Sequence, residues 1–382
     1  MGFFLFSRTK NSMSITIGIL IPRSDIFPTL PQHVVKGIKL AFENEGIDAQ
    51  VIVCDIGKGV VQDLVMSKAN ELIMQDVDIT IAYAGKKVLD ALKALFRTSK
   101  KPLMLMGMGP NITREEELGE APYIASNSFD LWHTCYLLGE YAAKNIGKQG
   151  IASVGLFEGG YQLLPAFNES MVQNGGGVVA THISKQLDEI DFTGDLNNMI
   201  NSTPADYLVE FFSGIDSPRF YDLCVKSGIS KELPIITPSI GIEPFAEYNK
   251  RLVHGLSWQP FVKNAANEQM ITSFTQKHNE EPSAYVALAY ETALWIAEGI
   301  KACDGKFNTA TYCEAIAKAS FQSPRGGFTV NSEKNTNQPF PTIIVDGETV
   351  ASYSIAAEQE KELVESFSSR VQAGWFNPFP CA

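Results

Sequence analysis

The sequence predicts an α/β protein of two lobes, each built on a largely parallel sheet. Short continuous apolar runs alternate with segments whose apolar residues recur at helical spacing, and such runs are typical of strands covered on both faces. The alternation occurs in two tandem series, at residues 15–108 and 151–237. Strands that alternate with helices of this length favour parallel pairing through right-handed crossovers. The length of 382 residues also suggests two compact units, at about 100–200 residues per domain.

The first series begins with a strong β-loop-α unit. Strands are expected at residues 15–22, 50–55, 78–83 and 102–108. The buried faces of the helices between them are indicated by Val34, Val35, Ile38, Ala41 and Phe42, by Val61, Leu64, Val65, Leu72 and Ile73, and by Val88, Leu89, Leu92, Leu95 and Phe96. A polar stretch at residues 125–128 then interrupts the alternation. We predict that the chain crosses into the second lobe there.

The second series repeats the pattern and is followed by a helical region. Its strands are expected at residues 151–157, 178–183, 207–212 and 233–237, with helices near 163–173, 192–200 and 218–226. Helices are then indicated at residues 269–278, 285–303 and 309–319, and strand-like segments at 327–330 and 342–345. Two parallel-sheet lobes in tandem are therefore the predicted architecture.

Composition and charge narrow the class of partner. The chain has 31 Lys and Arg against 43 Asp and Glu, a net charge of −12, and no basic block interleaved with aromatic residues. Nucleic acids and anionic membrane surfaces are therefore disfavoured as partners. A bilayer span needs about 20 consecutive apolar residues, and no such run occurs. Arg8 and Lys10 follow the short apolar start, the reverse of a secretory signal, so the expectation from the residues is a cytoplasmic chain that binds a small molecule or a protein.

The search for catalytic, metal and nucleotide motifs finds none that is complete. The six cysteines form no C-x-x-C pair, and the five histidines form no metal-binding cluster. Ser239 lacks the leading glycine of a nucleophile elbow. Gly107 and Gly109 lack the third glycine of a dinucleotide fingerprint, and Thr80 stands where a phosphate loop before Gly85 needs a glycine. We therefore expect no catalytic residues, no metal and no cofactor.

The geometry of parallel sheets indicates where a ligand would bind. Ligands collect beyond the carboxyl ends of strands, where helix N-termini present unsatisfied N–H groups. The corresponding loops here are residues 23–28, 84–87, 107–111, 158–162, 213–217 and 238–243. Aromatic side chains in or near these loops are Phe27, Tyr83, Tyr161, Phe212 and Trp258. Their concentration at strand ends predicts a pocket for a small solute.

The chain resembles the type I periplasmic solute-binding proteins, in the branch that serves branched-chain amino acid and amide ABC transporters. The similarity extends from residue 15 to about residue 350. Its marks in chain order are IGILIP at residues 17–22, KGIKLA at 36–41, GGY at 159–161, DFTGDL at 191–196 with PAD at 204–206, AYETA at 289–293, and SPRGGFTV at 323–330. Each motif is weak by itself, but their order and spacing together are specific.

The resemblance implies two Rossmann-like lobes with parallel sheets, joined by a three-crossing hinge that closes around a solute without catalysis. The lobes would comprise residues 13–127 with 257–333, and 128–256 with 334–354. The implied ligand is an amino acid, an amide or a short peptide-like solute, and the implied partner is an ABC permease. The resembled family would also place the chain in the periplasm, as an alternative to the cytoplasm.

Candidate ligand-binding residues combine this resemblance with the strand-end loops. Tyr161 resembles the family's aromatic clamp, and Glu243 matches its acidic ligand for a substrate amine. The full predicted set is Phe27, Tyr83, Gly85, Lys86, Lys87, Met108, Gly109, Asn127, Tyr161, Phe212, Ser213, Ser239, Glu243 and Trp258. Two departures from the family are evident: Gly85, Lys86 and Lys87 replace a run of serines, and Met108-Gly109-Pro110 replaces an Ala-x-Thr element.

The segment after residue 350 extends beyond the resembled pattern. Leu363, Val364, Phe367 and Val371 predict an amphipathic helix in the extension at residues 355–382. Residues 374–382, with two prolines and three aromatic residues, favour an extended peptide instead. One interpretation is a tail packed on the lobes. The other is a cytosolic carrier or modification substrate that presents Trp375, Cys381 and Ala382 to an enzyme or to a tail-recognising protein.

Overall fold

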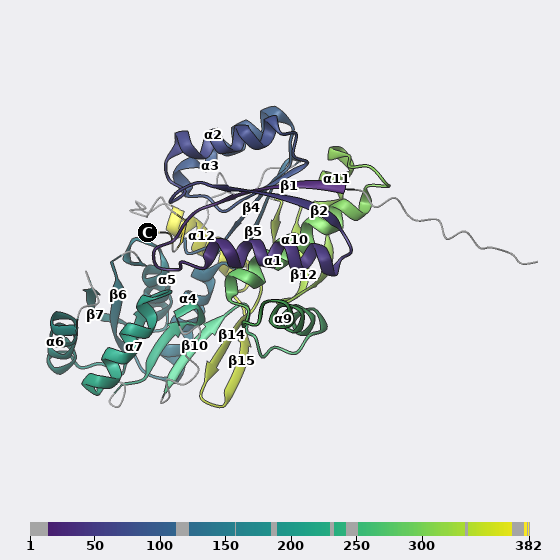
Figure 1. The fold of residues 1–382 in the computed structure, drawn as a ribbon. Coiled ribbons are helices and arrows are strands. Elements are labelled where there is room, and N and C mark those ends of the chain that lie inside the picture. The colour runs from purple at the N-terminus through teal and green to yellow at the C-terminus, as the bar shows by residue number, and fades with distance from the viewer. Residues whose placement is uncertain are drawn as a thin grey trace, which may run out of the picture.

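The computed structural model describes residues 14–111, 122–156, 158–184, 189–229, 233–241, 251–332, 335–368, 378, 379 and 381. Two sheets form separate lobes, and helices cover both faces of each (Figure 1). This confirms the predicted pair of parallel-dominated α/β lobes. None of the helices in the described ranges is long and apolar enough to cross a membrane.

The first sheet has the strand order β11-β12-β13-β5-β4-β3-β1-β2. Its parallel part consists of β1 (Ser14–Ile21), β2 (Asp48–Asp55), β3 (Ile79–Ala82), β4 (Leu103–Gly107) and β5 (Ile124–Ser128). The other strands are β11 (Ser320–Ser323), β12 (Gly326–Asn331) and the short β13 (Thr336–Asn337), which is antiparallel to β12 and parallel to β5. The carboxyl ends of β3, β4 and β5 therefore meet at one edge of the sheet.

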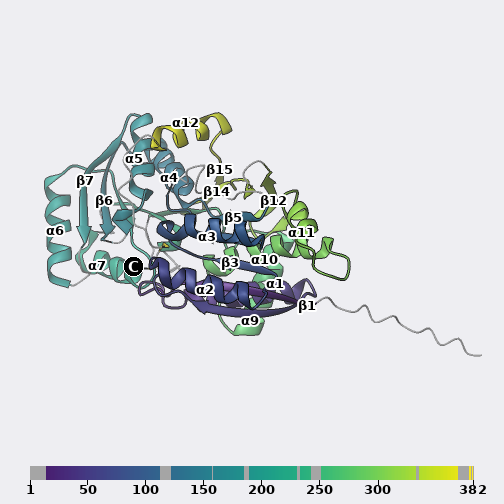
Figure 2. The same ribbon diagram turned by 90° about the horizontal axis from the view of Figure 1, so that it is seen from above.

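Helices on both faces explain why β1 is a continuous apolar run. Ile15, Ile17 and Ile19 are buried in the cluster that contains α1 (Leu30–Asn44) and α10 (Ala284–Ala302), whereas Leu20 faces the cluster of α2 (Gln62–Met74) and α3 (Lys86–Ser99). These two helix pairs lie on opposite sides of the sheet (Figures 1 and 2). Helices α9 (Ala265–His278) and α11 (Thr309–Ile316) complete this lobe.

The second sheet has the strand order β15-β14-β10-β9-β8-β6-β7. Its strands are β6 (Gln149–Gly155), β7 (Gly177–Ser184), β8 (Tyr207–Phe211), β9 (Ile235–Pro238), β10 (Leu252–Leu256), β14 (Thr342–Asp346) and β15 (Thr349–Tyr353). Its helices are α4 (Leu131–Asn145), α5 (Leu163–Gln173), α6 (Glu189–Ser202) and α7 (Asp216–Ser227). The strands from β6 to β10 pair in parallel, and β14 and β15 are antiparallel.

The chain passes between the sheets three times. It leaves the first sheet after β5, returns after β10, and leaves again between β13 and β14. The sequence placed residues 334–354 in the second lobe, but β13, inside that range, pairs with β12 and β5 of the first sheet. The division of the whole chain into lobes by residue number stays a prediction.

The polar stretch at residues 125–128 is strand β5 and not only a crossing, which corrects the sequence prediction. Its Asn127 is fully buried, and the side chain donates to Glu291 Oε1 at 3.2 Å and to Thr292 Oγ1 at 3.0 Å. Burial of a polar strand residue is tolerated because these distant partners satisfy it. The strands β10, β11, β13 and β15 were also not predicted.

The extension begins with the predicted helix, α12 (Ala357–Ser368). Leu363 and Phe367 are buried on its inner face, whereas Val371, also assigned to that face, lies outside the described residues. Beyond α12, Pro378, Phe379 and Cys381 are described, and all three are buried.

Candidate ligand-binding cleft

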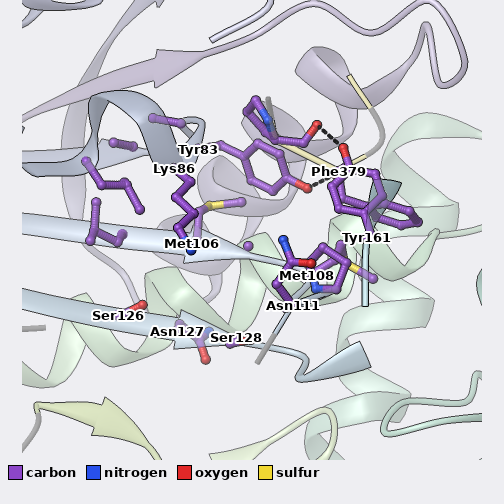
Figure 3. Close-up of a pocket in the computed structure, with 18 residues that line it drawn as sticks. Tyr83, Lys86, Met106, Met108, Asn111, Ser126, Asn127, Ser128, Tyr161 and Phe379 are labelled. Atoms are coloured by element: carbon purple, nitrogen blue, oxygen red, sulfur yellow. Dashed lines mark hydrogen bonds between the residues drawn. The ribbon is translucent and has the colours of Figure 1, made fainter. Parts of the chain in front are cut away.

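A cavity lies between the lobes at the carboxyl ends of the central strands of the first sheet. Its wall includes Tyr83 and Lys86 after β3, residues 108–111 after β4, residues 126–128 of β5, and Tyr161 after β6 (Figure 3). This is the position at which open parallel sheets bind ligands. The cavity volume is about 140 Å³.

The lobes contact each other across the mouth of this cavity. The backbone N–H of Ile215 donates to the carbonyl oxygen of Ile26 at 2.9 Å, and the N–H of Gln162 donates to Asn111 Oδ1 at 3.0 Å. Gly214 has a φ of +57°, and a Cβ there would collide with the Ile26 carbonyl. Glycine is therefore needed for this close approach, and the structure represents a closed arrangement of the lobes.

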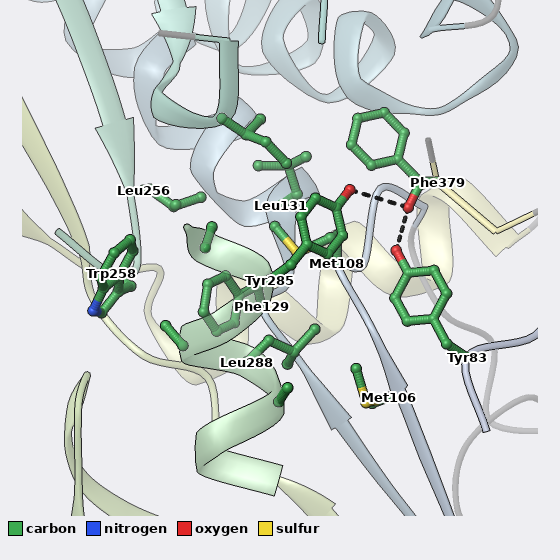
Figure 4. Close-up of a cluster of buried hydrophobic side chains, with 14 of the residues drawn as sticks. Tyr83, Met106, Met108, Phe129, Leu131, Leu256, Trp258, Tyr285, Leu288 and Phe379 are labelled. Carbon is green, nitrogen blue, oxygen red and sulfur yellow. Dashed lines mark hydrogen bonds between the residues drawn. The ribbon is translucent and has the colours of Figure 1, made fainter. Parts of the chain in front are cut away.

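Three tyrosines converge inside the closed cleft. The hydroxyls of Tyr83 and Tyr285 both donate to the carbonyl oxygen of Phe379, the latter at 3.3 Å (Figure 4). The hydroxyl of Tyr161 lies 3.5 Å from the carbonyl oxygen of Pro378. Burial raises the pKa of each of the three phenols above the ordinary value for tyrosine. They therefore stay protonated near neutral pH and act as hydrogen-bond donors toward an acceptor oxygen.

The C-terminal tail supplies the group that these tyrosines hold. The Phe379 ring is 3% exposed and meets the Tyr161 ring edge to face, with centroids 4.9 Å apart. The N–H of Cys381 donates to the carbonyl oxygen of Pro378 at 2.7 Å, which closes a tight turn. Pro378 and Phe379 are thus part of the cavity wall.

The comparisons with known proteins agree with this architecture. The family model described as periplasmic binding protein matches residues 14–345. The chain belongs to this family. The match confirms the resemblance inferred from the sequence motifs. A comparison with curated protein sequences finds no match.

Solved structures of substrate-binding and solute-binding proteins of transporters share the fold at low sequence identity. An ABC transporter substrate-binding protein from Sphaerobacter thermophilus is 18% identical, with a TM-score of 0.74 over 90% of this chain and 97% of that one. A solute-binding protein from Rhodopseudomonas palustris in complex with benzoate is 19% identical, with a TM-score of 0.73 over 91% and 98%. The branched-chain amino acid transporter protein of Streptococcus pneumoniae in complex with isoleucine is 15% identical, with a TM-score of 0.67 over 89% and 100%.

The structure brings six of the predicted site residues to the cavity wall. They are Tyr83, Lys86, Met108, Gly109, Asn127 and Tyr161. Gly85 lies immediately behind the wall as the N-terminal cap of α3, where its N–H donates to the Gly59 carbonyl at 3.0 Å. Lys87, the second residue of α3, is exposed. Phe27 is half-buried and packs on Tyr285, with ring centroids 4.7 Å apart.

The other predicted residues lie within the lobes and not at the cavity wall. Phe212 stacks on Phe220 at 4.7 Å in the core of the second lobe. Ser239 is within 2.8 Å of His254 Nδ1, and Trp258 Nε1 donates to Asn267 Oδ1 at 2.8 Å. Ser213 is buried and hydrogen-bonds with Glu158. Glu243, Trp375 and Ala382 lie outside the described residues.

Sequence reasoning missed Tyr285, Met106 and Asn111. Tyr285 is the second residue of α10, after the capping Ser283, and its helical surroundings indicated only core packing. Asn111 follows β4 and bridges the lobes through its contact with Gln162. Its position at a strand end was the available signal. Phe379 belongs to the aromatic tail noted in the sequence, but its place in the cleft depends on the fold.

A buried ion pair lies beside the three crossings. The Arg325 guanidinium binds both carboxylate oxygens of Glu291, through Nη2 to Oε1 and through Nε to Oε2 at 3.0 Å. Its Nη1 donates to Ser257 at 3.3 Å, and it stacks over the rings of Phe129 and Phe340. Phe129 follows β5, Ser257 follows β10 and Phe340 precedes β14. The Arg325 side chain therefore contacts the chain at all three crossings.

The described residues contain no group of three or more His, Cys, Asp or Glu side chains that could hold a metal ion. The described cysteines are buried and unpaired with one another. The polar groups at the cavity are phenols, amides, hydroxyls and one lysine.

Proposed function

We propose that the chain is a non-catalytic solute-binding protein that encloses a small molecule between its lobes. The observation that carries this proposal is the convergence of the Tyr83 and Tyr285 hydroxyls on one carbonyl oxygen, with the Tyr161 ring beside it. Such a site binds a molecule that places an acceptor oxygen next to a flat or apolar group. Membership of the periplasmic binding protein family supports the same function.

The chemistry of the wall favours a neutral or anionic solute over a cationic one. Lys86 is the single charged residue among the described residues that line the cavity, and a positive charge attracts a carboxylate. The fold neighbours described above were solved with benzoate and with isoleucine, and both molecules carry a carboxylate. We therefore infer an aromatic or apolar carboxylic acid, or the corresponding amide, as the solute class.

The biological role that this supports is delivery of the solute to an ABC permease. The structural neighbours include ABC transporter substrate-binding proteins, and the name of the family favours the periplasm over the cytoplasmic location expected from the residues. The carrier alternative is not favoured, because Pro378, Phe379 and Cys381 are buried and not displayed on the surface.

A thermal-shift panel tests the proposed function. Benzoate, phenylalanine, leucine and benzamide are each added to the full chain, with lysine as the cationic control. We expect at least one of the first four to raise the unfolding temperature in a dose-dependent way, because a ligand that binds only the folded state stabilises it. No shift with any of the four, or a shift with lysine alone, would contradict the proposed solute class.

A further inference from the structure

We propose that Pro378 and Phe379 are a tethered occupant of the cleft, which competes with the solute and holds the lobes closed in its absence. The inference rests on the proposed function for the identity of the competitor. It concerns the regulation of the same site by a segment of the chain itself.

The first support is that the tail contacts both lobes at the centre of the cleft. The Phe379 carbonyl accepts from Tyr83, which follows β3, and from Tyr285, the second residue of α10, and both belong to the first lobe. The Phe379 ring and the Pro378 carbonyl meet Tyr161, which follows β6 of the second lobe. A segment held from both sides stabilises the closed arrangement, as a bound ligand does in hinge closure.

The second support is that the tail and a solute cannot use the same donors together. A phenol hydroxyl has one hydrogen to donate, and those of Tyr83 and Tyr285 are both directed to the Phe379 oxygen (Figure 4). A solute oxygen can accept from this pair only after the Phe379 carbonyl has left. The tail and a solute that accepts from Tyr83 and Tyr285 therefore exclude each other.

The third support is the space in the cleft. The cavity of about 140 Å³ is smaller than the roughly 300–1,000 Å³ of ordinary ligand pockets, and Pro378 and Phe379 form part of its wall. Pro378 also lies against Gly59, where a Cβ would be 2.9 Å from the Pro378 Cγ. Departure of the tail would enlarge the cavity next to Tyr161, where the Phe379 ring now sits (Figure 3).

Competition is measured first with variants of the tail. Calorimetry compares the full chain, a chain lacking residues 378–382, and the full-length variant Phe379→Ala, with the solute that gives the largest thermal shift. If the tail occupies about 90–99% of the molecules, the chain lacking residues 378–382 should bind roughly ten- to a hundredfold more tightly. Phe379→Ala keeps the main-chain carbonyl and loses the ring contact with Tyr161, so it should gain affinity by a smaller factor. Phe261→Ala, at a phenylalanine that is 48% exposed, is the matched control and should leave the affinity unchanged.

Cys381 gives a second readout in the unmodified chain. Its side chain is buried in the tail-bound state, so a thiol reagent should label it slowly. If the solute displaces the tail, added solute should speed labelling of Cys381, with the same concentration dependence as binding. Cys381→Ser should abolish the solute-dependent phase and so assign it. The proposal would be overturned if the tail variants bound the solute with the same affinity as the unmodified chain and if added solute did not change the labelling of Cys381.

A synthetic peptide of residues 374–382 separates this inference from the proposed function. Added to the chain that lacks residues 378–382, it should bind and should weaken solute binding in proportion to its concentration. If the peptide binds but none of the solutes does, the tethered occupant is supported and the proposed solute class fails. If solutes bind and the peptide neither binds nor competes, the proposed function stands and the tethered occupant fails.

Discussion

The two lobes bury carboxylates in opposite ways. In the first lobe, Glu291 is fully buried but pairs with the equally buried Arg325. In the second lobe, Glu158 and Glu210 are buried, and Glu210 accepts hydrogen bonds from the Phe212 N–H and the Tyr221 hydroxyl, both at 2.8 Å, in place of an ion pair within the described residues. Burial raises the pKa of Glu158 to about 7 and that of Glu210 to about 8. The buried carboxylate beside the crossings therefore has a charged partner, whereas the second lobe gains buried negative charge above neutrality that no ion pair among the described residues balances.

Replacement of Arg325 should have the largest effect on stability. Arg325→Met leaves the Glu291 carboxylate buried without its partner, which costs about 3–5 kcal/mol of unfolding free energy. Urea unfolding measures this loss. Lys318→Met is the control, because the Lys318–Glu314 pair is more than two-thirds exposed on both sides and should contribute less than about 1 kcal/mol. A loss for Arg325→Met as small as that of the control would show that the ion pair does not hold the crossings.

The buried carboxyl of Glu210, which accepts hydrogen bonds from Phe212 and Tyr221, should make the second lobe sensitive to pH. Its pKa is raised in the folded state from an ordinary 4.5 to about 8, so the folded chain prefers the protonated form. The stabilisation is complete below pH 4.5 and is lost as pH rises through 8, by on the order of 2–4 kcal/mol.

The test of this pH dependence is Glu210→Gln, measured by thermal unfolding at pH 5 and pH 9. The variant should lose most of the difference that the unmodified chain shows between these pH values. Some pH dependence should remain, because Glu158 is also buried with a raised pKa. Glu348→Gln, at an exposed position in the same lobe, should not change the difference. If the Glu210 variant kept the whole difference in thermal stability between pH 5 and pH 9, Glu210 would not be the source of that difference.

The two lobes also contribute unequally to the cavity wall. Tyr161 is the one described residue of the second lobe that lines it. In the chain lacking residues 378–382, Tyr161→Ala should weaken solute binding by about 1–3 kcal/mol, because an aromatic wall is lost. That is roughly ten- to a hundredfold in affinity, while Tyr161→Phe keeps the ring and most of the affinity. Unchanged affinity with a large loss of thermal stability would show that Tyr161 is a core residue.

The smallest expected effect is that of a single donor in the first lobe. Tyr83→Phe removes one hydroxyl from the pair that faces the acceptor oxygen, and a net hydrogen bond contributes about 1 kcal/mol. Calorimetry on the same shortened chain should show roughly fivefold weaker binding. Tyr353→Phe, in β15 at the edge of the second sheet, is the control. An effect no larger than that of Tyr353→Phe would place the solute away from Tyr83.

Most of the fold was predictable because its signals are local. The apolar run of β1 and the helical spacing of α5 are visible in the sequence, and α5 was predicted with its exact bounds. Strand β5 was not, because Asn127 is buried through partners more than 160 residues away. Strand β13 was missed for a related reason, since it is two residues long and exists only through its pairing with β12 and β5.

The candidate site was predictable to the extent that strand ends determine it. Tyr83, Met108 and Asn127 come together because the carboxyl ends of neighbouring parallel strands share an edge. Phe212 also follows a strand, but it packs on α7 through Phe220, and its direction depends on the twist and register of β8. The place of Phe379 depends on a chain segment that returns after both lobes are complete, which no local pattern predicts.

The most direct test of the account is a crystal structure of the chain lacking residues 378–382, soaked with the solute that gives the largest thermal shift. We expect a solute oxygen at the position of the Phe379 carbonyl oxygen, within hydrogen-bond distance of the Tyr83 and Tyr285 hydroxyls, and an apolar group beside Tyr161. An empty cleft at saturating solute, or a solute bound elsewhere on the molecule, would contradict it.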